Sequence, residues 1–349
     1  MVPTSEIINS SSLVFVHPQM PGIYRKGKPG SFYYVNKEGS RISNEADLER
    51  IKKLVLPPAW KDVWISAKKN GYLQATGIDV AGRKQYRYHH EWTSRRSDHK
   101  YFRLLEFGKV LPHARKQIAK DLRRKNLDER KVLAICTDVM QKTLIRIGSE
   151  SYKKSYGSYG LSTLKDQHFK EHDSKAMLSF VGKKGVKQEV ELNHKNLIQL
   201  VKRCKDIPGQ ELFQFYTGNG NAHKAVDSGM INNYIREITN CDFTAKDFRT
   251  WGGTLEALRQ LACFTEQYPE MSKKKIIVEV LDEVARKLGN TRAVCKSSYV
   301  YPLLLENFEN DGLEKYLKRI HVKEPRTTAA IENDEKVLMQ FLKKAATYR

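Results

Sequence analysis

Apolar residues recur along the chain with two different periods, and the change between them divides the sequence into two parts. Up to about residue 92 the apolar runs are short and separated by turn residues, which predicts strands at 31–35, 63–65 and 72–75. Farther along, apolar residues recur every three or four positions, which is the spacing of amphipathic helices. The pattern predicts an α+β protein, with a small β-rich domain at 1–96 and a larger, mostly helical domain at 97–349.

Each predicted domain also contains one element of the other kind. Residues 44–55 have apolar positions at helical spacing and end before a Pro-Pro pair, which predicts a short helix inside the β-rich domain. Residues 177–181 and 186–192 predict two strands inside the helical domain, joined by the turn that carries Lys183. A lysine at a hairpin tip is most often only a solvated side chain. Residues 94–98 are the predicted linker between the domains.

Capping signals and glycines bound the main helices. An apolar stripe from Val132 to Ile147 follows a capping-box signal at residues 126–129, and Arg146 lies just off this stripe in the last turn, where the helix dipole favours a cation. A second capping box, at 244–247, opens a helix whose first turn contains Arg249. The dipole favours an anion there, so helix stability does not explain this arginine. A third helix ends at Gly289.

The charge balance indicates a polyanionic partner. The chain has 62 Lys and Arg against 40 Asp and Glu, a formal net charge of +22, and nucleic acid is the first candidate at such an excess. The five cysteines are scattered without a metal-binding or disulfide spacing, which fits a reducing cytoplasm. We find no signal peptide and no apolar run near the ~20 residues of a membrane span. The expectation is a cytoplasmic protein without a membrane segment.

No cofactor motif stands out. The chain lacks a phosphate-binding loop, so no ATP requirement is expected, and it lacks an acidic cluster typical of a two-metal site. The pattern His168-Phe169-Lys170-Glu171-His172 matches that of one zinc-peptidase class. That pattern requires a helix, whereas these residues lead into the predicted hairpin. We therefore expect neither a cofactor nor a metal.

Two tyrosine-containing segments are candidates for chemistry or binding. Tyr299 follows Gly289 within a run of small and polar residues, and its phenol is a poor nucleophile at neutral pH unless neighbouring cations stabilise its anion. By residue type alone, Tyr299 is more often an ordinary half-buried tyrosine. In a strand at 85–92, Tyr86 and Tyr88 share one face and Gln85 lies on the other. Such a strand either packs in the core or contacts a nucleic-acid backbone and its base edges.

Several long stretches, in a fixed order, carry a resemblance to one family. They are Leu-Pro-Pro-Ala-Trp-Lys-Asp-Val-Trp at 56–64, Leu-Gln-Ala-Thr-Gly at 73–77, Gly-Arg-Lys-Gln-Tyr-Arg-Tyr at 82–88, Thr-Leu-Ile-Arg-Ile-Gly at 143–148, Lys-Asp-Phe-Arg-Thr-Trp at 246–251 and the tyrosine segment at 288–302. Together they resemble the type IB DNA topoisomerases of the small bacterial and poxvirus-like branch, and are nearest to the bacterial members. The match runs from about residue 22 to residue 302.

The resemblance implies a catalytic set of Arg146, Lys183, Arg249 and Tyr299. Poxvirus-type members have a histidine where this chain has Asn290, which keeps a hydrogen-bond donor but carries no charge. The bacterial members resemble this chain there, so Asn290 is retained as a site residue. Arg292 stands where the family usually has a proline. The neighbouring tyrosine at 301 is the rival nucleophile, and the motif places the nucleophile at Tyr299.

The family's activity and partner follow from the same resemblance. It implies that the tyrosine forms a 3′-phosphotyrosyl bond in duplex DNA, that the nicked DNA rotates, and that the strand is resealed without ATP or metal. It also implies a monomer that clamps double-stranded DNA, with the β-rich domain as one jaw, in the cytoplasm at the nucleoid. The candidate DNA-contact residues are Arg83, Gln85, Tyr86, Tyr88, Tyr152, Lys165 and Lys246.

Two other functions share parts of this pattern. Tyrosine recombinases use the same Arg–Lys–Arg–Tyr chemistry, but they typically have His-x-x-Arg at the second arginine, whereas residues 246–249 read Lys-Asp-Phe-Arg. Their amino-terminal DNA domain is usually helical, in contrast to the β-rich domain predicted here. A DNA-binding protein with a decayed site is the other alternative. The presence of all four ionisable catalytic positions argues against decay.

Overall fold

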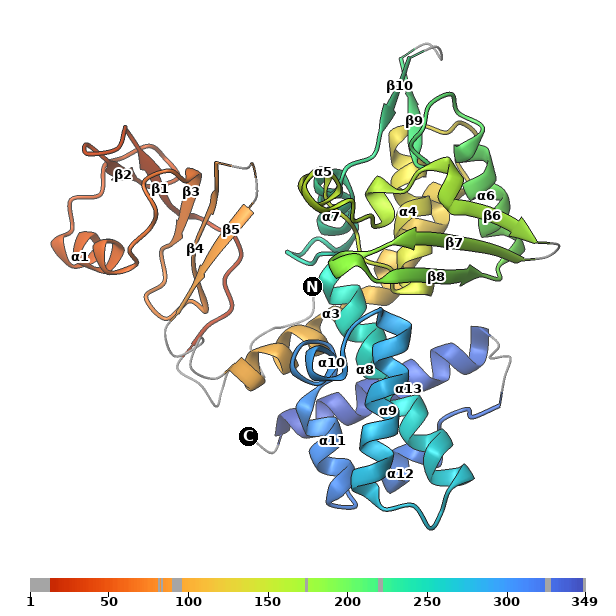
Figure 1. Ribbon diagram of the computed structural model, residues 1–349. Helices are drawn as coiled ribbons and strands as arrows, with labels where there is room; N and C mark the ends of the chain where they lie inside the picture. Colours follow the sequence, from red (N-terminus) through yellow and green to blue (C-terminus); the bar gives the residue numbers. More distant parts are fainter. Residues whose placement is uncertain are drawn as a thin grey trace. The chain divides into compact units, whose positions relative to one another are not determined.

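The computed structural model describes residues 13–80, 82, 84–89, 96–172, 175–218, 222–323 and 328–347. The chain divides into an N-terminal unit of residues 1–100 and a C-terminal unit of residues 101–348 (Figure 1). The predicted α+β class is confirmed, because the first unit is built on an antiparallel sheet and the second is mostly helical. Among the described helices, none combines the length and apolar character needed to cross a bilayer.

The N-terminal unit is built on one antiparallel sheet of five strands, in the spatial order β2-β1-β3-β4-β5 (Figure 1). The bounds are β1 Gly22–Lys26, β2 Tyr33–Val35, helix α1 Glu45–Lys53, β3 Lys61–Ser66, β4 Leu73–Ile78 and β5 Lys84–Tyr88. The strands predicted from the short apolar runs overlap β2, β3 and β4, and the predicted short helix is α1.

Alternation along the strands gives this sheet two buried faces. Ile65 of β3 packs in a cluster with Ile51 of α1, so the helix covers one face. The next residue back along β3, Trp64, packs in a second cluster with Leu73 and with Val16 from the segment before β1. Because both faces carry apolar residues, the small unit has a core on each side of its sheet.

The C-terminal unit contains most of the helices. Their bounds are α3 Arg96–Leu122, α4 Glu129–Thr143, α5 Glu150–Tyr156, α6 Lys195–Lys205, α7 Ser228–Thr239, α8 Ala245–Gln267, α9 Lys273–Leu288, α10 Arg292–Ser298, α11 Pro302–Glu309, α12 Glu314–Leu317 and α13 Thr328–Thr347. The predicted linker at 94–98 overlaps the first residues of α3, so it is helical from residue 96 onward. Ser97 and Asp98 are residues that the first turn of a helix favours.

Helix α4 lies at the centre of this unit. Every residue from Lys131 to Met140 is buried, and the helix contacts α6, α7 and α8. Its N-cap is Asp128, whose carboxylate accepts a hydrogen bond of 2.9 Å from the Lys131 backbone N–H. The predicted capping signal therefore lies at the right end of the helix, but Asp128 provides the cap two residues after the residue that opens the predicted motif.

A small antiparallel sheet covers part of α4. It consists of β6 Phe169–His172, β7 Lys175–Val181 and β8 Lys187–Leu192, in that order. The predicted hairpin is confirmed, with Val181 paired to Lys187 across the turn. The zinc-peptidase pattern ends on strand β6 rather than on a helix, as expected. Two further strands, β9 Gln214–Thr217 and β10 Ala222–Ala225, form a separate ribbon.

The C-terminal helix α13 is fastened to the rest of the unit by buried charges as well as by its apolar stripe. Asp334 is fully buried and accepts a hydrogen bond of 2.8 Å from Arg259 of α8. Glu335 pairs with Arg115 of α3 and accepts a hydrogen bond of 3.0 Å from the indole of Trp251. Since removal of one partner leaves a buried charge, these contacts make α13 part of the fold of this unit.

Candidate active site

Arg146 is positioned by the way helix α4 ends. The helix stops at Thr143, and Leu144 takes the left-handed conformation with φ of 57°. The chain then leaves the helix axis, so Arg146 lies in an irregular segment beyond the helix. The prediction that Arg146 occupies the last helical turn is wrong, because the apolar stripe continues past the point where the backbone turns away. Because Arg146 lies beyond the helix, the helix dipole does not explain why an arginine stands at this position.

Arg249 is the fifth residue of α8, just past the first turn in which it was predicted to lie. The predicted capping box is confirmed, since the Asp247 carboxylate accepts a hydrogen bond of 2.8 Å from the Thr244 backbone N–H. The Arg249 guanidinium is only 3% exposed, and it donates to the backbone carbonyls of Leu144 and Leu288. The second of these bonds is 2.9 Å.

These two carbonyls belong to the ends of two other helices. Leu144 is the C-cap of α4 and Leu288 is the last residue of α9. Helix C-termini have unsatisfied carbonyls and favour cations, so Arg249 stabilises both ends although it starts a third helix. The expectation that fold stability does not explain this arginine is therefore wrong, because the side chain acts on helices far away in the sequence.

Tyr299 follows the short helix α10, which the apolar pattern did not predict. Gly289 ends α9 in the left-handed conformation, and Thr291 caps α10 two residues later. The Tyr299 side chain is half-buried, and the Arg249 guanidinium carbon lies 5.0 Å from the centre of its ring. A Cβ at Gly253 of α8 would lie 3.0 Å from the Tyr299 carbonyl oxygen, closer than most such contacts, so the glycine favours the close approach of the two segments.

A threonine fixes the backbone on both sides of this tyrosine. Thr254 is fully buried in α8, and its hydroxyl donates to the Tyr299 carbonyl at 3.1 Å and accepts from the Tyr301 backbone N–H at 3.2 Å. Tyr301 is itself 1% exposed. The rival tyrosine is thus inside the core, whereas Tyr299 keeps part of its surface exposed.

Asn290 connects Arg146 to the start of the tyrosine segment. The Arg146 guanidinium donates to the Asn290 side-chain oxygen. The buried thiol of Cys295, one helical turn before Tyr299, lies near both arginines and the Asn290 amide. Burial raises the pKa of Cys295 to about 11, and the two positive charges only partly oppose this rise.

The two arginines bring positive charge into a desolvated place without a carboxylate partner. Burial lowers the pKa of Arg146 and of Arg249, the phenol of Tyr299 opposes this effect, and Arg146 further lowers the pKa of Arg249. No carboxylate of the described chain contributes to either shift. The Arg249 Nε is buried with no hydrogen-bond partner among the described residues. Such a site can stabilise an anion placed beside the phenol.

Lys183 lies at the exposed turn between β7 and β8, as predicted. Its ammonium lies 5.6 Å from the centre of the Tyr152 ring on α5, a cation–π contact. The structure thus brings Arg146, Arg249 and Asn290 together at Tyr299, and it joins Lys183 to a different predicted site residue.

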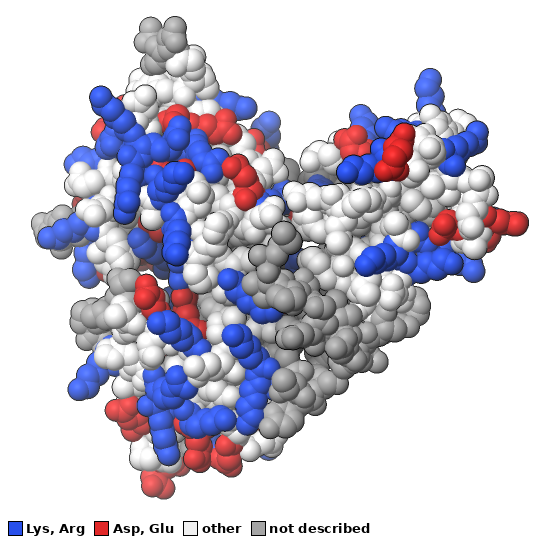
Figure 2. Space-filling model, turned by 180° about the vertical axis from the view of Figure 1, so that it is seen from behind, with Lys and Arg blue, Asp and Glu red and all other residues white. Residues whose placement is uncertain are grey.

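The remaining predicted contacts of the C-terminal unit are not gathered at one point. Tyr152 is 48% exposed, and Lys246 is exposed at the start of α8. Lys165 is half-buried, and its ammonium donates to the Gln210 side chain at 3.2 Å. Lysine and arginine side chains form patches on the visible face of the molecule, interrupted by acidic groups (Figure 2).

In the N-terminal unit, the predicted contact strand is β5. Tyr86 and Tyr88 stack at 6.2 Å between ring centres and pack against the cluster that contains Trp64. Gln85 donates to the Asp79 carboxylate at 2.8 Å. The tyrosines are only partly buried, so core packing uses one part of each ring and leaves another part accessible. Arg83 lies outside the described residues.

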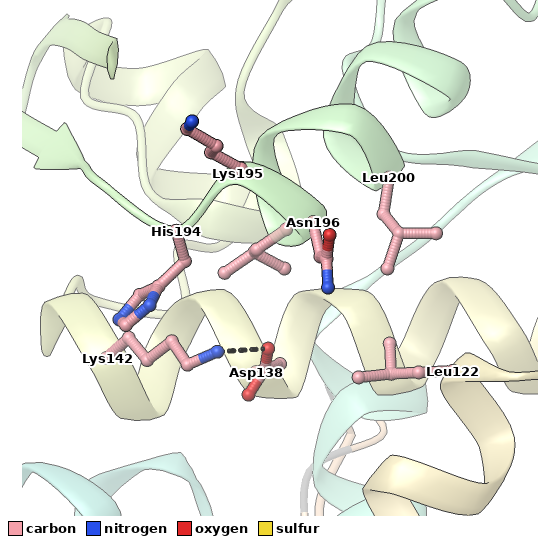
Figure 3. A pocket seen from close by; sticks show the side chains of 8 residues that line it. Leu122, Asp138, Lys142, His194, Lys195, Asn196 and Leu200 are labelled. Carbon is pink, nitrogen blue, oxygen red and sulfur yellow. Dashed lines mark hydrogen bonds and ion pairs between the residues drawn. The ribbon is translucent and has the colours of Figure 1, made fainter. Parts of the chain in front are cut away.

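A cavity of about 280 Å³ in the C-terminal unit lies away from these residues. Leu122, Asp138, Lys142, His194, Lys195, Asn196, Leu197 and Leu200 line it, and none of them is a predicted site residue (Figure 3). Lys142 and Asp138 form an ion pair of 2.8 Å beside it. This cavity is therefore separate from the cluster of Arg146, Arg249, Asn290 and Tyr299.

Sequence reasoning did not identify two contributors to the cluster. Thr254 gives no signal in the sequence, because a threonine inside a helix usually bonds to its own helix. Cys295 is four residues before Tyr299, a spacing that places both on one face if the segment is helical. Because the sequence pattern did not predict the short helix α10, this shared face was not recognised.

Comparison with known proteins identifies the family of this chain. A model of the eukaryotic DNA topoisomerase I catalytic core matches residues 89–324, and a model of the bacterial DNA topoisomerase IB N-terminal domain matches residues 31–79. DNA topoisomerase 1B of Acanthamoeba polyphaga mimivirus is 32% identical over 298 residues, which are 84% of this chain and 89% of that protein. DNA topoisomerase 1B of vaccinia virus (strain Copenhagen) is 25% identical over 232 residues, 66% and 70% of the two chains. The resemblance seen in the sequence is confirmed, and the chain belongs to the type IB DNA topoisomerase family of isomerases.

Proposed function

We propose that this protein relaxes supercoiled double-stranded DNA by reversible transesterification at Tyr299. The phenol oxygen attacks a backbone phosphorus, the bond from phosphorus to the 5′-oxygen breaks, and a 3′-phosphotyrosyl bond forms. The cut strand rotates about the intact one. The 5′-hydroxyl then attacks the same phosphorus, releases the tyrosine and reseals the strand.

The observation that carries this proposal is the pair of desolvated guanidiniums beside Tyr299. Attack on a phosphodiester builds negative charge on the phosphoryl oxygens, and Arg146 and Arg249 lie where they can stabilise that charge. Since neither pairs with a carboxylate in the described chain, a phosphate is the partner that completes the site. Asn290 adds an uncharged hydrogen-bond donor beside them.

Lys183 has the proposed role of proton donor to the departing 5′-oxygen. Its exposed turn can approach DNA, where contact with the duplex would remove water from the ammonium and lower the barrier to proton transfer. One phosphodiester replaces another of similar energy, so the reaction as proposed needs neither ATP nor a metal. The proton that Tyr299 loses and the proton that the 5′-oxygen gains balance over one cleavage event.

The proposed DNA partner is a duplex held by both units as a monomer. Gln85, Tyr86 and Tyr88 would contact it from the N-terminal unit, and Tyr152 and Lys165 from the C-terminal unit. Arg83 and Lys246 are further proposed contacts with its phosphates. We place the enzyme in the cytoplasm at the nucleoid. The N-terminal sheet also argues against a recombinase, for which a helical DNA domain is usual.

The deciding experiment is relaxation of plasmid DNA by the purified protein with EDTA present and no nucleotide. We expect positive and negative supercoils to be removed alike, because rotation about an intact strand has no preferred direction. A protein that binds the plasmid but leaves its linking number unchanged under these conditions contradicts the proposal.

A further inference from the structure

One side chain of the β7–β8 hairpin lies between two glycines, each of which directly precedes a candidate active-site residue. Gln188 of β8 is half-buried, in contrast to its exposed neighbours along the strand. A Cβ placed on Gly182, just before Lys183, would come 2.8 Å from the Gln188 Cγ. A Cβ placed on Gly289, just before Asn290, would overlap the Gln188 carboxamide oxygen.

This placement joins two segments more than 100 residues apart in the chain. The stem of Gln188 packs on the Lys183 turn (residues 182–186), and its oxygen rests on the backbone at the end of α9. Its amide nitrogen donates at 3.2 Å to the carbonyl of its neighbour Lys187, which leaves the oxygen directed at Gly289. The contact therefore depends on a side chain of this length at this position.

The two segments differ in how firmly they are held. Arg249 bonds to Leu288 at the end of α9, and Thr254 fixes the backbone around Tyr299. In the Lys183 turn, by contrast, residues 183, 185 and 186 are exposed. Loss of a contact between the two segments should consequently move the turn and leave the tyrosine segment in place.

We propose that Gln188 is a positioning residue that sets the distance of Lys183 from the reacting phosphate by bracing its turn against Gly289. This inference rests on the proposed function, in which Lys183 donates a proton to the 5′-oxygen. Gln188 itself touches neither the phosphate nor the leaving group in this scheme. Its effect should therefore fall on the step that uses Lys183 and not on the attack by the phenol.

The test compares single-turnover cleavage of two duplexes that differ only in the leaving atom. A 5′-oxygen needs a proton from the enzyme, whereas a 5′-thiolate departs without one. We expect Gln188→Ala to cleave the oxygen substrate roughly tenfold or more slowly, since misplacement by about 1 Å can reduce rates by up to about a hundredfold. Its rate on the thiolate substrate and its DNA affinity should match those of the wild type.

Glu189→Ala is the matched control, because the next side chain along β8 is exposed. Glu189→Ala should leave the ratio of the cleavage rates on the 5′-oxygen and 5′-thiolate substrates unchanged, because a change in DNA binding affects both substrates alike. Lys183→Ala, measured in parallel, should show the full loss on oxygen and recovery on thiolate. Urea unfolding curves verify that each variant is folded.

A double-mutant cycle tests the contact itself. Gly182 has φ of −91° and ψ of −167°, an extended conformation open to alanine, so only the Gln188 stem opposes a side chain there. Gly182→Ala should therefore slow oxygen-substrate cleavage in the wild type and have little further effect in Gln188→Ala. If the rate losses of the two single variants simply multiply in the double variant, the proposed contact is overturned.

Three outcomes separate this inference from the proposed function. Equal loss on both substrates in Gln188→Ala, or no loss on either, overturns the positioning role of Gln188. If Lys183→Ala itself does not recover on the thiolate, the proton-donor role of Lys183 fails, and the inference fails with it. A wild-type protein that forms no covalent adduct at all contradicts the proposed function directly.

Discussion

Replacement of Arg249 by alanine should damage the fold and the chemistry together, whereas replacement of Arg146 should damage the chemistry alone. Arg249 is buried and donates to the carbonyls that end α4 and α9, so Arg249→Ala leaves two buried acceptors without a donor. Arg146 is half-buried, and its hydrogen bond in the described chain is to the Asn290 side chain.

The expected difference in the free energy of unfolding between the two variants follows from these contacts. Each charge-assisted hydrogen bond lost from a buried acceptor costs about 1.5–3 kcal/mol, so Arg249→Ala should lower the free energy of unfolding by about 3 kcal/mol or more. For a unit of this size that corresponds to a fall in Tm of about 6–12 °C. Arg146→Ala removes one such bond, to the Asn290 side chain, which costs about 1.5–3 kcal/mol, and it relieves the desolvation of the half-buried Arg146 charge. It also removes a positive charge that disfavours the charged form of Arg249, so its net change should be close to zero.

Two measurements on the same preparations test this pair. Thermal or urea unfolding reports the stability of the C-terminal unit, and denaturing gels after incubation with duplex DNA report the covalent adduct. Both variants should lose the adduct, and only Arg249→Ala should unfold earlier. An Arg249→Ala protein with wild-type stability would refute the dual role, because the carbonyls of Leu144 and Leu288 would then not depend on the guanidinium.

Four further predictions concern the tyrosine segment and the Lys183 turn. Tyr299→Phe should bind DNA without forming a covalent adduct, whereas Tyr301→Phe should still form one. Peptide mapping of a trapped adduct to a residue other than Tyr299 would contradict the assignment of Tyr299 as the nucleophile. Lys183→Ala should cleave an ordinary duplex slowly and recover with a 5′-thiolate leaving group; persistent slowness there would exclude proton donation. Thr254→Val should lower the free energy of unfolding by about 1–3 kcal/mol, as measured by urea titration. It should also slow single-turnover cleavage at unchanged DNA affinity. Wild-type values for both would show that the hydrogen bonds of the Thr254 hydroxyl to the Tyr299 and Tyr301 backbone are dispensable. Burial raises the pKa of Cys295 to about 11, so at pH 8 about one thiol in a thousand is ionised. Cys295 should thus resist iodoacetamide until the chain is unfolded, and labelling of the native protein there would argue against its burial.

The elements of the fold were largely readable from local patterns. Helical periodicity and capping residues predict α4, α8 and α9 because these signals act within one or two turns of the chain. Alternating residues and turn signals likewise predict β2, β3 and β4 of the first sheet and the β7–β8 hairpin. Several elements were not predicted, among them β1 of the first sheet, the start of α3 within the predicted linker, and α10, which is a helix of only seven residues.

The candidate site shows the same contrast between what local patterns predict and what they miss. The motifs name the residues, and the amphipathic pattern places them on or near their elements. Local patterns do not reveal that the backbone turns at Leu144 and leaves Arg146 beyond the helix, because the apolar stripe continues past the turn. Capping signals describe the helix that carries Arg249 but not the two helices that its side chain stabilises.

By itself, the sequence determined the division into a β-rich and a helical part, the excess of positive charge and the set of chemically competent side chains, since these depend on composition and on neighbours a few residues apart. Tertiary structure decided which side chains share a site and which also hold the fold together. The two arginines and Asn290 are more than 40 residues from at least one of their partners, and such contacts depend on how helices pack rather than on any local pattern. The same reason explains why the contact of Gln188 with Gly289 became visible only in the folded chain.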